Sequence, residues 1–123
     1  MEEWKLEFEW LRIRHYIKEK LGRSDLPDLN SILFLIGIQE LGRVQETFTK
    51  EEKQDLMHVA VCVLLSEVGY FEFVGLDADG WPHFKQMKPL DINGVKSQEE
   101  LLKERVIGYF EPEVITHEKN HDQ

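Results

Sequence analysis

The stretch that decides the fold is Ser31–Leu41, which reads Ser-Ile-Leu-Phe-Leu-Ile-Gly-Ile-Gln-Glu-Leu. Eight of its eleven residues are apolar or glycine, so a helix built from it has no polar face. Such a helix has to be surrounded by the rest of its domain. The stretch is too short to cross a bilayer, which needs about 20 apolar residues. We therefore expect a central helix over 30–41, with Ile32–Ile38 at the middle of the molecule.

Gly37 lies inside this predicted helix, where glycine costs about 1 kcal/mol relative to alanine. A glycine retained at that cost usually has a packing reason. We therefore expect another helix to cross closely at Gly37.

The composition of the whole chain indicates a folded domain and limits the kind of partner. With 123 residues, 41% of them hydrophobic, the chain has material for one core. Its 24 acidic residues exceed its 15 Lys and Arg, giving a net charge of −9, which argues against general nucleic-acid binding. Its single cysteine cannot form an intrachain disulfide. Without an apolar run long enough for a signal peptide or a membrane span, the sequence predicts a cytoplasmic protein with no membrane contact.

Residues 2–21 predict a helix with two apolar stripes. One stripe recurs every three or four residues and consists of Leu6, Trp10, Ile13, Ile17 and Leu21. Trp4, Phe8 and Leu11 form the second stripe. Both stripes can be core, or the second can be a partner surface, most simply in a homodimer, because large exposed apolar patches mark interaction sites.

Residues 50–68 predict a third helix, opened by a Thr49–Glu52 capping box. Asp55, His58 and Cys62 follow one another on the side opposite its apolar face. These are metal-ligand residue types at helical spacing, so a ligand or metal site is one interpretation. The other is that they form the less buried face of an amphipathic helix.

Residues 70–87 predict a β-hairpin around the loop 77–80. In this register Phe73 faces Phe84 and Glu72 faces Lys85, both favourable cross-strand pairs. We expect Phe71, Phe73 and Phe84 to cover the helices. We expect the outer face to present Trp81 and His83 to a protein partner or a small ligand.

The C-terminal part predicts a fourth helix over 98–110, capped by Ser97 and ended at Pro112. This makes 1–110 a single globular domain and 111–123 a flexible acidic tail. The tail contains His117, Glu118 and His121 in the His-Glu-x-x-His pattern of zinc hydrolases. We interpret the match as chance, because that chemistry needs a supported helix and a walled cleft.

Together these elements predict a mainly helical α+β protein. Over residues 4–87 the order of three helices and a hairpin resembles winged-helix domains, which implies a transcriptional regulator whose third helix reads DNA. That helix offers Lys50 and Lys53 against Glu51, Glu52 and Asp55, which implies weak or lost DNA binding. We expect no cofactor and no catalytic residues. The leading hypothesis is an interaction or scaffold module that self-associates through Trp4, Phe8, Leu11, Trp81 and His83.

Overall fold

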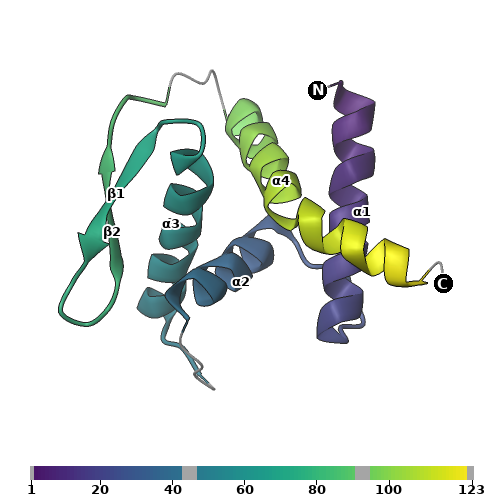
Figure 1. Ribbon diagram of the computed structural model, residues 1–123, viewed down its shortest axis with the longest axis horizontal. Helices are drawn as coiled ribbons and strands as arrows, with labels where there is room; N and C mark the ends of the chain where they lie inside the picture. Colours follow the sequence, from purple (N-terminus) through teal and green to yellow (C-terminus); the bar gives the residue numbers. More distant parts are fainter. Residues whose placement is uncertain (1, 43–46, 91–94, 122–123) are drawn as a thin grey trace. The chain divides into compact units, whose positions relative to one another are not determined.

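The computed structural model describes residues 2–42, 47–90 and 95–121 (Figure 1). Within these ranges the chain forms four helices and one antiparallel hairpin: α1 (Glu3–Leu21), α2 (Leu29–Leu41), α3 (Lys50–Ser66), β1 (Phe71–Leu76), β2 (Pro82–Gln86) and α4 (Val95–His121). The predicted mainly helical α+β class is confirmed. Among the described helices, none combines the length and the apolar character that a membrane span requires.

The chain divides into two compact units. The first consists of Met1–Asp28 and Ile92–Gln123 and contains α1 and α4. The second, Leu29–Asp91, contains α2, α3 and the hairpin. The single globular domain expected over 1–110 stays a prediction.

In the first unit, α1 packs against α4. The predicted inner stripe of α1 is buried at Leu6, Trp10, Ile13 and Ile17. Leu21 was expected to continue this stripe but is 46% exposed, because it is the last helical residue before the chain turns away. Gly22 makes that turn at a φ of +65°, a value that favours glycine. From α4 the buried residues are Val106, Ile107, Phe110 and Val114.

The predicted end of the fourth helix at Pro112 is wrong, because α4 continues to His121 with Pro112 inside it. The helix also begins at Val95, before the predicted cap Ser97. Figure 1 shows α4 changing direction along its length, as a helix does where proline removes one backbone hydrogen bond. Beyond Pro112, Val114 is buried at 1% exposure and so stabilises the continuation. The described part of the segment expected as a flexible tail is therefore helical.

In the second unit, α2 crosses α3 at the glycine that the sequence singled out. A Cβ atom on Gly37 would lie 2.6 Å from the carbonyl carbon of Leu56, closer than real Cβ contacts allow. The expected close crossing at Gly37 is confirmed. Every residue from Ser31 to Ile38 is buried or half-buried. Their place at the middle of the whole molecule stays a prediction.

The capping box at the start of α3 is confirmed. The backbone N–H of Glu52 donates to the Thr49 hydroxyl at 3.1 Å, and the backbone N–H of Thr49 donates to the Glu52 carboxylate at 3.0 Å. Cys62 departs from the expectation, since it is only 1% exposed although it was assigned to the polar side. The reason is tertiary, because α3 contacts both strands of the hairpin on that side (Figure 1).

The register of the hairpin is confirmed at its open end and shifts near the loop. Glu72 pairs with Lys85 and Phe73 with Phe84, as predicted. The next pair joins Gly75 to His83, so Val74 is an extra residue in β1. The expectation that Phe73 covers the helices is wrong, because its side chain is 54% exposed.

Candidate functional site

A cavity of about 410 Å³ lies where the hairpin covers α3. Its volume falls within the range of about 300–1,000 Å³ that is typical of small-ligand sites. The cavity is lined by Asp55, His58, Val59, Cys62, Asp77, Trp81, Pro82, His83 and Phe84. The candidate ligand residues of α3 and the candidate hairpin residues therefore line one cavity. This corrects the expectation that Trp81 and His83 occupy the outer face of the hairpin.

Helical spacing brings the three α3 side chains to this cavity. Asp55, His58 and Cys62 lie three and four residues apart, so they follow one face of the helix. His58 and Asp55 are exposed at the side of the helix, whereas Cys62 is buried beneath the hairpin.

Cys62 and His58 form a contact of 3.6 Å between the thiol sulfur and the ring Nε2. Burial raises the pKa of the Cys62 thiol, which keeps it protonated. A nucleophilic cysteine needs the opposite shift, toward the thiolate. The pair therefore does not have the electrostatics of an activated nucleophile, and we assign it no catalytic role.

Asp77 organises the hairpin side of the cavity. One of its oxygens, Oδ1, accepts hydrogen bonds from the backbone N–H groups of Asp79 at 2.9 Å and Trp81 at 3.0 Å. The other, Oδ2, lies 2.9 Å from Nε2 of His83. The bond to His83 and the two backbone bonds lower the pKa of Asp77. Asp77 therefore stays ionised and fixes the loop that presents Trp81.

The metal-ligand residue types of the cavity meet in pairs. Within the described parts of the chain, no group of three or more His, Cys, Asp or Glu side chains is placed to hold a metal ion. His58 contacts Cys62 and His83 contacts Asp77, so these ligand types meet as separate pairs.

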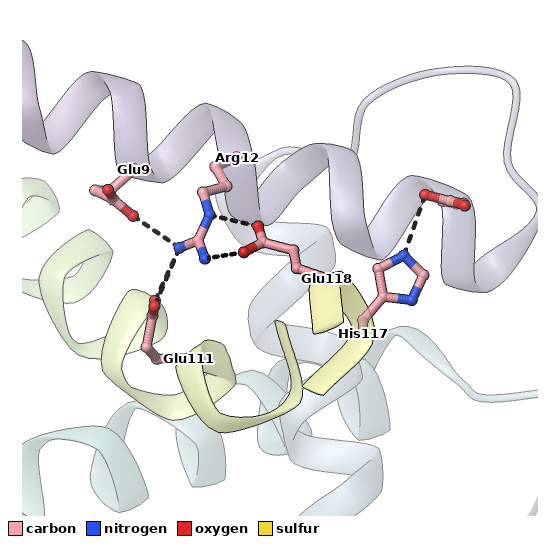
Figure 2. Close-up of polar contacts among 6 residues, drawn as sticks. Glu9, Arg12, Glu111, His117 and Glu118 are labelled. Carbon is pink, nitrogen blue, oxygen red and sulfur yellow. Dashed lines mark hydrogen bonds and ion pairs between the residues drawn. The ribbon is translucent and has the colours of Figure 1, made fainter. Parts of the chain in front are cut away.

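A second polar cluster joins α1 to α4 and is centred on Arg12 (Figure 2). The guanidinium donates to both carboxylate oxygens of Glu118, from Nε at 2.8 Å and from Nη2 at 2.9 Å. Its Nη1 donates to Glu111 at 3.1 Å and to Glu9 at 3.0 Å. The Arg12 guanidinium lowers the pKa of Glu118, which stays ionised. Glu111 and Glu118 lie seven residues apart on α4, so both reach Arg12 from one face of that helix.

The His-Glu-x-x-His match belongs to this cluster. Its residues lie in α4, contrary to the expectation of an unstructured tail. Both oxygens of Glu118 bind Arg12, so the carboxylate is not placed to activate a metal-bound water. Nε2 of His117 lies 3.5 Å from a carboxylate oxygen of Glu19 on α1 (Figure 2). His117 and Glu118 thus contribute to the packing of α1 on α4.

Tyr16 adds a further polar contact between the same two helices. Its hydroxyl donates to Glu113 at 2.9 Å, and the Lys20 ammonium donates to the same oxygen at 3.0 Å. Burial, together with Glu113, raises the pKa of Tyr16 to about 12. The hydroxyl therefore acts as a donor at any physiological pH.

The second apolar stripe of α1 is exposed. Trp4, Phe8 and Leu11 have exposed fractions of 69%, 62% and 43%. The residues of the inner stripe, by contrast, are at most 5% exposed. The interpretation of both stripes as core is therefore wrong for this one.

Comparison with known protein families, with curated proteins and with solved structures finds no match to this chain. Its function has to be argued from its own residues and geometry.

Proposed function

We propose that this protein is an interaction module that self-associates through Trp4, Phe8 and Leu11 on α1. The observation that carries the proposal is the exposure of these three side chains, at 69%, 62% and 43%, on a helix whose inner stripe is already buried. Burying one large apolar side chain contributes about 1.5–3 kcal/mol. A partner that covers the stripe gains this free energy without disturbing the core.

The spacing of the stripe suits a helical partner. Trp4, Phe8 and Leu11 are separated by four and then three residues, the alternation found along a helix–helix seam. A second copy of the chain presents the same stripe, so a two-fold pairing buries both at once. Because a stable interface needs about 1,200–2,000 Å² and three side chains supply a small part of that, we expect a weak dimer.

The alternative of a winged-helix regulator gains no support from the charges. Glu51 and Asp55 are exposed on α3, and Asp77 and Asp79 are exposed at the tip of the hairpin. These carboxylates would face the phosphates of a bound duplex. A gel shift at low salt that retained DNA would favour the regulator.

The test of self-association is sedimentation equilibrium from about 1 to 200 μM, the range in which a dissociation constant of a weak dimer falls. We expect the average mass to rise above that of the 14.6-kDa monomer with concentration. Phe8→Lys should abolish the rise, because it places a charge in the proposed interface. Leu21→Lys is the matched control, since Leu21 is 46% exposed on the same helix but lies outside the stripe.

Two results would contradict the proposal. One is a monomeric mass at every concentration of the unaltered chain. The other is a Phe8→Lys variant that self-associates as strongly as the Leu21→Lys control.

A further inference from the structure

We infer that the cavity between α3 and the hairpin binds a small organic cation, that is, a protonated amine on an aromatic or apolar body. This site is made by residues of the second unit, whereas the α1 stripe belongs to the first, so the two proposals rest on different residues. Three features of the cavity lead to this ligand class: its charge, its aromatic wall and its size.

The charge of the lining is negative. Asp55 and Asp77 contribute carboxylates, and no lysine or arginine is among the lining residues in the described chain. Asp77 already has a hydrogen-bond partner in His83. The Asp55 carboxylate forms no hydrogen bond or ion pair with any described residue. A cation is the ligand that complements it, whereas an anion would be repelled.

The wall opposite α3 is aromatic. Trp81 and Phe84 are half-buried and line the cavity from the hairpin, with Pro82 between them in the lining. Aromatic faces attract cations, and tryptophan does so most strongly. Val59 adds apolar surface from α3. A ligand with a charged end and an apolar body can therefore satisfy Asp55 and the aromatic wall together.

The binding partner must be organic rather than a bare metal ion. The ligand-type side chains form separate pairs, and no described group of three could hold a metal. The volume of about 410 Å³ also exceeds what an ion needs and suits a small molecule.

The experiment uses two probes with the same ring and chain: phenethylamine, which is cationic, and 3-phenylpropionate, which is anionic. Binding is followed by ¹H–¹⁵N NMR through the indole N–H of Trp81. Trp4 and Trp10 serve as internal references in the same spectrum, because neither lines the cavity. We expect phenethylamine to shift the Trp81 signal in a saturable way at concentrations up to about 10 mM, the range of a weak small ligand. We expect 3-phenylpropionate to leave it in place.

Asp55→Asn keeps the shape of the side chain and removes its charge, so it should weaken phenethylamine binding by about fivefold, as expected for a solvent-accessible ion pair. Glu51→Gln is the matched control. It makes the same change one turn earlier on α3, outside the cavity, and should leave the affinity unchanged. The inference would be overturned if phenethylamine did not shift the Trp81 signal, or if both probes shifted it equally. It would also be overturned if Asp55→Asn left the affinity for phenethylamine unchanged.

Discussion

The α1–α4 interface and the α3–hairpin interface contain similar side chains but use them differently. In the α1–α4 interface, Arg12 donates to three carboxylates and Tyr16 to a fourth, so each of these carboxylates has a hydrogen-bond donor within the protein. Between α3 and the hairpin, a cavity lies beside the contact of the two elements, and no lysine or arginine among its described lining residues faces the Asp55 carboxylate. The difference shows that a sequence motif indicates a binding site only when its side chains are not already bonded to other side chains of the fold. His117 and Glu118 of the His-Glu-x-x-His match take part in the packing of α1 on α4, whereas residues that fit no motif line a cavity.

The largest expected effect is the loss of stability when a phenylalanine is replaced by alanine, compared between the two interfaces. Phe110 is fully buried in α4, so Phe110→Ala should lower the free energy of unfolding by about 3–5 kcal/mol. Phe84 is half-buried beside an existing cavity, so Phe84→Ala should cost about 1–2 kcal/mol. Urea denaturation followed by circular dichroism measures both. Equal losses would mean that the two interfaces are packed alike.

A smaller effect is expected on stability when one charged side chain is neutralised in each of the two interfaces. Arg12→Gln leaves Glu9, Glu111 and Glu118 close together without their cation, and should cost about 1–2 kcal/mol, between the values for exposed and buried ion pairs. Asp55→Asn should change the stability by less than about 0.5 kcal/mol, because no described partner is lost. The same denaturation measurement applies. An Asp55→Asn variant as unstable as Arg12→Gln would remove the distinction between the clusters.

The smallest effect is a pH dependence in the α1–α4 interface. Because folding raises the pKa of Tyr16 to about 12 from the ordinary tyrosine value of 10.0, the protonated hydroxyl stabilises the folded state. This contribution is fully present below pH 10 and is lost as the pH rises through 12. The difference in tyrosinate absorbance between the unaltered chain and Tyr16→Phe should therefore develop near pH 12. Ionisation near pH 10 while the protein is still helical would show that Tyr16 does not bind Glu113 as described.

Local chemistry allowed a good part of the fold to be predicted from the sequence. Gly37 indicated a close helix crossing because its conformational cost needed a reason. Thr49 and Glu52 indicated the start of α3, since a capping box acts within one turn. The pairing of Phe73 with Phe84 followed from matching side chains across the hairpin.

The predictions that were wrong failed because of contacts between residues that lie far apart in the sequence. Pro112 was expected to end a helix, but contacts of Val114, Glu113 and Glu118 stabilise the part beyond it. Cys62 was placed on a polar face because the sequence does not show that the hairpin folds over that face.

The same causes limited the prediction of the site. Asp55, His58 and Cys62 could be grouped by their helical spacing. Their meeting with Trp81 and His83 depends on the loop that Asp77 organises, which the alternating pattern of the strands does not reveal. The pairing of Arg12 with Glu118 could not be predicted either, because the two residues lie far apart in the sequence and no local pattern connects them.

The most direct test of the contrast between the two interfaces is one NMR titration of the unaltered protein with phenethylamine. Trp81 reports on the cavity, and Trp10, which is 5% exposed, reports on the core of the first unit. We predict that the indole signal of Trp81 shifts to saturation while that of Trp10 stays in place. A stationary Trp81 signal, or equal shifts at both residues, would contradict the account.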